Sequence, residues 1–409
     1  MDSKNRMEMK QHIRQRVLET MDFTREVKDS EVIGALDEYI AEEARKTYIG
    51  VKDRQKLRKD VFNSLRRFDI LQDLLEDESV TEIMVNGPDV IFIEKNGRLE
   101  RFDGSFESVS RLEDVAQQMT ALANRRINEA SPIVDTRLPG GERVNIVLRP
   151  VSISGPTITI RKFSKDVLSM DHLLEIGSIT KEAADFLQNL VAAGYNILVS
   201  GGTGSGKTTF LNILSGFVPP AERVITIEDS AELKLRNLPN LVSLESRNAN
   251  VEGRNAVTIR DLIKTSLRMR PDRIIVGEVR GDEAIDMLQA MNTGHDGSLS
   301  TIHANSSKDV ISRLETMILL SAEIPLPAVR GQIASAVDII VQLGRMRDKS
   351  RKVLEICEVL NYEQGEVRIS PLFSFVEEGE DENGRVLGAL KASGQLRNIG
   401  KLRRAGICG

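Results

Sequence analysis

A glycine-rich stretch near the middle of the chain constrains its fold more than any other feature. Its sequence, Gly201-Gly-Thr-Gly-Ser-Gly-Lys207-Thr208, matches the pattern G-x-x-x-x-G-K-[ST], in which backbone amides surround a phosphate group. The apolar run 197–199 before it predicts a buried strand, and the apolar residues of 210–214 after it repeat with the period of a helix. A glycine turn that binds nothing is the alternative, but both flanks have the required type. The stretch therefore predicts a nucleoside triphosphate site.

Each residue type in this loop has a physical role in binding phosphate. Glycines let the backbone approach the phosphates closely, and the positive end of the following helix dipole adds attraction. Lys207 can reach the β- and γ-phosphates, and the Thr208 hydroxyl can bind Mg²⁺. The residues that we expect to contact the nucleotide are Gly202, Thr203, Gly204, Ser205, Gly206, Lys207, Thr208 and Thr209.

Acidic side chains follow two further apolar runs that predict strands of a parallel sheet. Glu228 and Asp229 follow the first run, and Glu278 follows the second. The carboxyl ends of strands in open α/β sheets face the ligand, so these carboxylates are candidates for orienting the attacking water. Many P-loop ATPases carry a metal-binding Asp directly before the second carboxylate, where this chain has Gly277. We therefore expect direct metal binding from Thr208 alone, with the three acids acting through water.

Two of the four histidines, His295 and His303, lie within nine residues on either side of a short run of small residues. No cysteine or third histidine lies nearby in the sequence, so a zinc site has little support. One interpretation is that each imidazole is hydrogen-bonded within the core. The other is a sensor that contacts the γ-phosphate or its water. The polar residues Ser300, Thr301 and His303 at a strand end favour the sensor.

Three arginines lie on or beside strand-like segments upstream of the glycine-rich loop: Arg143, Arg149 and Arg161. Arginines on exposed strands usually stay solvated and have no further role. Arginines clustered just before a P-loop domain can instead reach the triphosphate and neutralise its charge. The spacing favours neither interpretation.

The hydrophobic pattern divides the 409 residues into five segments. Residues 1–69 have the spacing of amphipathic helices, and residues 70–163 combine short strands, tight turns and a helix. A linker is expected at 164–170, followed by the P-loop domain at 171–376. The tail 377–409 is first acidic and then basic, which predicts a peripheral hairpin, a flexible end or a contact to a neighbour.

Composition narrows the partners and the compartment. A net charge of −5, 4% aromatic residues and no Trp are unfavourable for a surface that binds nucleic acid, so no direct nucleic-acid partner is expected. No apolar run approaches the roughly 18–20 residues of a membrane span, and the N-terminus lacks the apolar core of a signal peptide. Two cysteines are too few for a disulfide framework, which indicates a reducing compartment. We expect a soluble, cytoplasmic chain.

Four motifs in series resemble the type II/type IV secretion-system ATPase superfamily, and they span residues 201–209, 226–232, 275–280 and 293–305. The upstream stretches 80–88 and 137–145, and more weakly 384–391, resemble the Tad/Flp pilus (CpaF-like) branch. Many type II secretion ATPases carry a zinc element of four cysteines. This chain has only two cysteines, which is unlike that branch.

The resemblance implies an α/β fold, with a RecA-like P-loop NTPase domain preceded by a small α/β (PAS-like) domain and a helical N-terminal extension. It implies that ATP and Mg²⁺ bind, and that hydrolysis moves the two domains against each other in a hexameric homo-oligomer. Such rings lie on the inner face of the cytoplasmic membrane and associate with it peripherally, through inner-membrane platform proteins of a pilus or secretion system.

The resemblance also implies roles for the candidate residues. Glu278 would be the catalytic carboxylate, with Glu228 and Asp229 assisting Mg²⁺ and water. His303, together with His295, would sense phosphate. Positive charge from the N-terminal side would come from the three upstream arginines, without an indication of which one acts.

Other functions remain open at this stage. A type IV secretion ATPase that exports protein or nucleoprotein, a nucleic-acid translocase and a nucleotide-gated scaffold without hydrolysis could each be built on these motifs. A transporter nucleotide-binding subunit is disfavoured because no Leu-Ser-Gly-Gly-Gln lies between the loop and Glu278. A GTPase is disfavoured because the chain contains no Asn-Lys-x-Asp motif.

Overall fold

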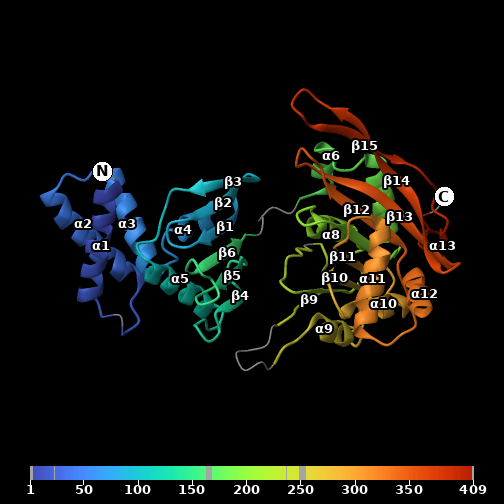
Figure 1. Ribbon diagram of the computed structural model, residues 1–409, viewed down its shortest axis with the longest axis horizontal. Helices are drawn as coiled ribbons and strands as arrows, with labels where there is room; N and C mark the ends of the chain where they lie inside the picture. Colours follow the sequence, from blue (N-terminus) through green and yellow to red (C-terminus); the bar gives the residue numbers. More distant parts are fainter. Residues whose placement is uncertain (1–2, 23, 163–167, 236, 248–254, 408–409) are drawn as a thin grey trace. The chain divides into compact units, whose positions relative to one another are not determined.

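A computed structural model describes residues 3–22, 24–162, 168–235, 237–247 and 255–407 of the chain (Figure 1). The chain forms two compact units, Met1–Lys165 and Asp166–Gly409, which are described in turn. Most of the linker predicted at 164–170, and the boundary predicted at residue 163, lie outside the described residues. No helix in the described ranges is both long enough and apolar enough to cross a membrane.

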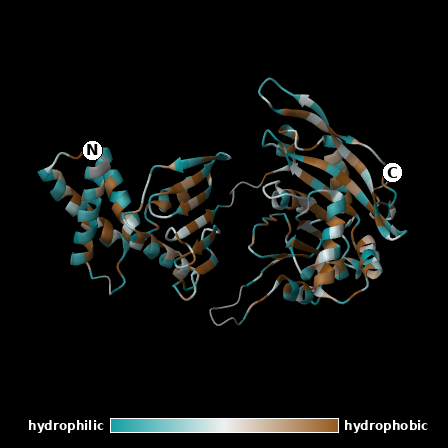
Figure 2. Ribbon diagram, in the orientation of Figure 1, coloured by the Kyte–Doolittle hydropathy of each residue, from teal (hydrophilic) through white to brown (hydrophobic). Residues whose placement is uncertain are grey.

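The first unit begins with three helices that pack around a small core of their own. They are α1 (Ser3–Thr20), α2 (Asp29–Lys46) and α3 (Val51–Arg66). Apolar residues spaced three to four apart form one face of each helix, and these faces are buried together. Figure 2 shows that hydrophilic residues make up much of the rest of these helices. The buried residues include Ile13, Val17, Val32, Leu36, Ile40, Leu57 and Val61.

An antiparallel sheet completes the first unit. Its strand order is β3-β2-β1-β6-β5-β4, and it packs against α4 (Leu71–Glu76) and α5 (Val109–Leu122) around a shared apolar core. Alternate residues of several strands are buried, which is typical of a sheet with one solvated face. The strands are β1 (Val80–Asn86), β2 (Ile91–Lys95), β3 (Arg98–Phe102), β4 (Ile133–Arg137), β5 (Arg143–Val147) and β6 (Thr157–Arg161).

The second unit is built on a larger mixed sheet with the order β15-β14-β13-β12-β7-β11-β10-β8-β9. The strands from β12 through β9 are parallel, and β13, β14 and β15 add to the β12 edge as antiparallel strands. The strands are β7 (Ile197–Gly201), β8 (Val224–Glu228), β9 (Leu241–Glu245), β10 (Arg273–Val279), β11 (Leu299–Ile302), β12 (Ile339–Arg345), β13 (Arg351–Glu363), β14 (Glu366–Glu380) and β15 (Val386–Ala392).

Helices cover both faces of the parallel strands, so β7, β8 and β10 are buried along almost their whole length and are mostly apolar. One core contains residues of α7 (Lys181–Ala192) and α8 (Lys207–Ser215). The opposite core contains residues of α9 (Ile259–Ser266), α10 (Glu283–Asn292), α11 (Ser307–Ser321) and α12 (Leu326–Ala336), the last three of which lie side by side (Figure 1). This architecture confirms the α/β class and the RecA-like P-loop domain.

The C-terminal residues are part of the second unit. The boundary predicted between residues 376 and 377 falls inside β14, so the first residues of the predicted tail continue a strand of the large sheet. The short helix α13 (Gly400–Arg404) is attached to the body of the unit by Lys401, whose Nζ lies 2.7 Å from both Asp338 and Asp296. The segment α6 (Met170–Glu175) precedes α7 at the start of the unit.

Candidate functional site

The glycine-rich loop connects β7 to α8 in a conformation that depends on its glycines. Gly204 and Gly206 have φ angles of +72° and +93°, which residues with a Cβ rarely adopt. A Cβ on Gly201 would lie 2.5 Å from the Ser205 Oγ and 2.7 Å from the Leu343 carbonyl oxygen. The sequence pattern is therefore explained by the backbone path and by close packing at this turn.

The loop also presents positive charge and the first amides of a helix. The N-cap of α8 is Gly206 and provides no side-chain cap, so the first amides and the dipole of the helix face the loop. Lys207 is buried, and its Nζ donates to the Gly202 carbonyl 3.0 Å away across the loop. These are the features expected of a phosphate site, and the residues present fit the phosphates of a nucleotide.

Glu228 and Gly277 lie at the ends of the adjacent strands β8 and β10, and they are packed against each other. The buried Glu228 Oε1 accepts hydrogen bonds from the backbone amides of Glu232 and Leu233, at 3.0 and 3.1 Å. Glu228 therefore holds the loop that follows β8, in addition to any role toward metal or water. The Asp that many P-loop ATPases carry before the catalytic acid has no room at position 277, because the Glu228 side chain occupies that space.

Glu278 lies at the centre of a chain of polar contacts. Its Oε1 lies 2.9 Å from the His303 Nε2, and its Oε2 accepts a hydrogen bond of 2.6 Å from the Arg280 Nη2. On the far side of His303, the Nδ1 lies 3.3 Å from the Lys207 Nζ. On the far side of Arg280, the Nη1 lies 3.4 Å from the Asp229 Oδ2. The structure thus connects the loop lysine to the predicted carboxylates through His303 and Arg280.

The surroundings of His303 define its charge and tautomer. Burial is the main cause that lowers the pKa of His303 below its ordinary value of 6.5, and the positive charge of Lys207 lowers it further. The imidazole is therefore neutral at pH 7. An ammonium group can only donate, so the Nδ1 facing Lys207 is the acceptor and the proton lies on Nε2, toward Glu278.

His295 is not brought to this site. β11 separates the two histidines and runs parallel to β7, so His303 lies at the end near the loop and His295 at the opposite end. A strand rises about 3.3 Å per residue, so the four residues of β11 that lie between the two histidines span about 13 Å. The His295 Nδ1 lies 3.2 Å from the Ala290 carbonyl oxygen, close to the start of β7. The two histidines do not face the same phosphate.

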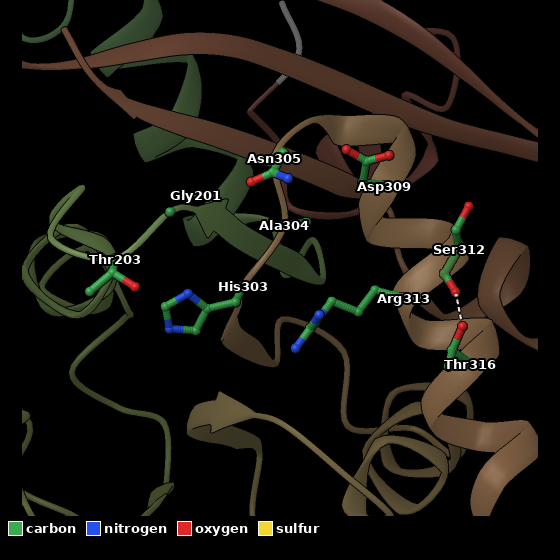
Figure 3. Close-up of a pocket in the computed structure, with 10 residues that line it drawn as sticks. Gly201, Thr203, His303, Ala304, Asn305, Asp309, Ser312, Arg313 and Thr316 are labelled. Carbon is green, nitrogen blue, oxygen red and sulfur yellow. Dashed lines mark hydrogen bonds between the residues drawn. The ribbon is translucent and has the colours of Figure 1, made fainter. Parts of the chain in front are cut away.

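A pocket of about 450 Å³ opens beside the loop and His303 (Figure 3). Its other wall is a polar stripe of α11, from which Arg313 extends toward His303 and contributes to lowering the pKa of that histidine. Sequence reasoning missed this stripe, although its spacing of three and four residues directly after His303 indicates one helix face. The lining residues outside the loop and His303 are Ala304, Asn305, Asp309, Ser312, Arg313 and Thr316.

The residues around the loop fit a Mg²⁺ ion that arrives with its nucleotide. Thr208 stands at the start of α8, directly after Lys207, where its hydroxyl is the expected ligand. Within the described ranges, no group of three or more His, Cys, Asp or Glu side chains is arranged to hold a metal ion. Mg²⁺ typically keeps several waters and takes few protein ligands besides the phosphates, which agrees with this arrangement.

The arginines of the first unit form a row across its sheet. Arg143 on β5 pairs with Arg161 on β6 and with Arg137 on β4, so all three occupy the same sheet face. The Arg161 Nε lies 3.7 Å from a Glu82 carboxylate oxygen on β1. Arg149 is exposed beyond the end of β5 and does not belong to this row. Sequence reasoning did not include Arg137 among the site residues, because the pairing of strands sets the row.

Comparisons with known proteins agree with this geometry. The family model described as "Type II/IV secretion system protein" matches residues 65–402. The chain is 39% identical to the putative conjugal transfer protein Rv3659c of Mycobacterium tuberculosis, over 73% of this chain and 86% of that protein. It is 35% identical to the type IV secretion system protein PtlH of Bordetella pertussis, over 69% of this chain and 91% of that protein.

A solved structure supports the fold. The ATPase DotB of Legionella pneumophila aligns with a TM-score of 0.51 and 20% identity, over 72% of this chain and 80% of that one. At this identity the likeness concerns the fold alone. The family model, which covers most of the chain, and the two relatives decide the family. This chain belongs to the type II/type IV secretion-system ATPase superfamily.

Proposed function

We propose that the chain is a Mg²⁺-dependent ATPase that powers assembly of a Tad/Flp type IV pilus, or protein secretion, through domain motions in a hexameric ring. The observation that carries this proposal is the continuous contact from Lys207 through His303 to Glu278. These contacts connect a phosphate-binding lysine directly to a carboxylate that can activate water. A nucleotide-gated scaffold without hydrolysis would have no use for that connection.

The proposed reaction assigns one task to each group. The loop amides and Lys207 bind the β- and γ-phosphates, and the Thr208 hydroxyl binds Mg²⁺. Mg²⁺, when bound with ATP, neutralises charge that develops on the transferred phosphoryl group. Glu278 accepts a proton from the attacking water, while Glu228 and Asp229 position the loop and the water around the metal. His303 contacts both Lys207 and Glu278, and it therefore couples phosphate binding by Lys207 to the position of Glu278.

The arginine row of the first unit is proposed to deliver positive charge to the triphosphate. Arg143 and Arg161 lie side by side in the sheet. Two adjacent guanidinium groups are better suited to binding an anion than to staying solvated separately. Arg149 lies outside the row, so we expect it to contribute less positive charge to the triphosphate. Closure of the first unit over bound ATP would couple hydrolysis to motion of the two units.

The proposed setting is the inner face of the cytoplasmic membrane, where the ring binds inner-membrane platform proteins without binding nucleic acid directly. The Tad/Flp assignment rests on the resemblance of residues 80–88 and 137–145 to that branch. The relatives' names favour a second candidate. A conjugal transfer protein and a type IV secretion protein are both similar to this chain, so export of protein or nucleoprotein is the alternative.

Two measurements test the proposal. Phosphate release from ATP by the full chain, with Mg²⁺ and then with a chelator, tests the reaction; turnover that is equal in both conditions contradicts it. Deletion of the gene in its host tests the setting. Loss of surface pili with retained DNA transfer supports pilus assembly, and loss of transfer or protein export with intact pili supports the alternative.

A further inference from the structure

Arg280 bridges two carboxylates that the proposed reaction uses. Its Nη2 lies 2.6 Å from the Glu278 Oε2 and its Nη1 lies 3.4 Å from the Asp229 Oδ2. Arg280 directly follows the last residue of β10 and lies two residues beyond Glu278 in the chain, which leaves its guanidinium within reach of that carboxylate. The neighbouring strand β8 brings Asp229 to the same edge of the sheet.

The main chain at Arg280 is fixed, although its side chain is exposed. The buried Glu283 accepts hydrogen bonds at its Oε1 from the backbone amides of Arg280 and Gly281, at 2.6 and 3.0 Å. The Arg280 side chain itself is 57% exposed, so it can exchange partners at little cost. An ion pair this exposed contributes little to folding stability. The position of Arg280 between two carboxylates therefore suggests another role.

The location matters because like charges repel at short range. Glu278 and Asp229 line one pocket of about 340 Å³ together with Arg280. Two carboxylates that face one site attract a cation strongly, whether that cation is a guanidinium or a divalent metal. The guanidinium therefore occupies the position from which a metal ion or its waters would contact both acids.

We propose that Arg280 is a positioning residue for Glu278, and that its guanidinium competes with the divalent cation for the carboxylates of Glu278 and Asp229. The inference rests on the proposed function, because it concerns the metal that accompanies ATP. Arg280 keeps Glu278 in place beside His303 and disfavours metal binding without nucleotide. Metal delivered together with ATP displaces the guanidinium and leaves Glu278 free to act on water.

Binding of Mn²⁺ to the full chain in the absence of nucleotide, followed by electron paramagnetic resonance, tests this competition. Arg280→Ala is expected to bind Mn²⁺ about fivefold to tenfold more tightly than the wild type, because one competing positive charge is lost. Arg280→Lys keeps a charge but cannot bridge both acids, so an intermediate affinity is expected. Combining Arg280→Ala with Glu278→Gln and Asp229→Asn should remove the gain.

Arg247 provides the matched control. It lines the same pocket, but its Nε donates to the Asn255 carbonyl oxygen 3.0 Å away rather than to Glu278 or Asp229. Arg247→Ala is expected to keep nearly the wild-type Mn²⁺ affinity. Equal affinities of the Arg280→Ala and Arg247→Ala variants would overturn the inference, and Arg280→Lys decides the matter if the alanine variant does not fold. Failure of the proposed function is recognised separately, as a wild-type chain that binds Mn²⁺ but does not hydrolyse ATP.

Discussion

Gly277 and Glu228 occupy one space at the end of neighbouring strands, since a Cβ at position 277 would come within 2.9 Å of the Glu228 Cγ. The pair accounts for the glycine at position 277, where many P-loop ATPases carry an Asp. Glu228 takes the position over β10 that such a side chain would need, and it uses that position to hold the backbone of residues 232 and 233. The space beside position 277 is therefore filled by a carboxylate from β8, while β10 contributes Glu278 one residue further on.

The first prediction concerns this packing. Gly277→Ala should lower the free energy of unfolding by about 1–3 kcal/mol, because overpacking a buried site forces its neighbours to shift. Adding Glu228→Ala removes the clashing atoms, so the double variant should be less destabilised than the sum of the two single changes. Urea unfolding of the four proteins measures this coupling. Strict additivity would mean that the two residues do not share the space.

The second prediction concerns Glu278, the proposed catalytic carboxylate. Glu278→Gln should retain ATP binding and lose about 10²–10⁴-fold in kcat, because the amide keeps the shape of the side chain but cannot accept a proton. Lys207→Ala should weaken ATP binding and turnover together, because Lys207 contacts the phosphates before and during the reaction. Equilibrium binding and phosphate release measure the two effects. Wild-type turnover of Glu278→Gln would remove Glu278 from the mechanism.

The third prediction uses the depressed pKa of His303. A histidine that is neutral in the folded chain takes up a proton more readily when unfolded, so its contribution to stability is complete above pH 6.5. That contribution is lost progressively as the pH falls below 6.5 toward the lower pKa of the folded state. His303→Gln should therefore lose less thermal stability than the wild type between pH 7.5 and pH 5. If the melting temperatures of the two proteins fall by the same amount over this pH range, the lowered pKa of His303 is contradicted.

Local features of the sequence predicted much of this site. The glycines, Lys207 and the apolar flanks suffice to predict the phosphate loop, because backbone geometry and periodicity act over a few residues. The acids at the ends of β8 and β10 were predicted for the same reason. Their actual partners were not, since the contact of Arg280 with Asp229 and the amides around Glu228 depend on strand order. The placement of His295 also depends on strand direction, which sequence spacing does not reveal.

The fold could be predicted from the sequence to a similar extent as the site. Amphipathic spacing indicates a helical segment over residues 1–69, without separating the first of its three helices, and alternating strands and helices indicate the α/β class. A peripheral hairpin was one of the predictions for the tail. The pairing of β13, β14 and β15 with the edge of the large sheet was not predicted, because the sequence pattern does not reveal which distant strands pair. The arginine row was likewise invisible, since Arg137, Arg143 and Arg161 are aligned only by the pairing of β4, β5 and β6.

The fourth prediction tests that row. If the row reaches ATP, Arg143→Ala and Arg161→Ala should each lower kcat by up to about 10²-fold while changing ATP affinity much less, because charge develops on the transferred phosphoryl group. Arg98→Ala, an exposed arginine on β3 of the same sheet, is the control and should remain active. Steady-state kinetics and equilibrium binding separate the two effects. Wild-type kcat in both variants would mean that these arginines stay solvated and do not act on ATP.

The last prediction is assembly. A motor that converts hydrolysis into motion of rigid units needs neighbours to push against, and a closed ring supplies them without leaving unpaired interfaces. The chain provides two compact units joined by one segment, which suits such motion. We therefore expect a hexamer that forms more readily with nucleotide, and ATPase activity per chain that rises with protein concentration. Light scattering and activity across a dilution series measure both. A monomer with constant turnover in saturating ATP would exclude the ring while leaving the nucleotide site intact.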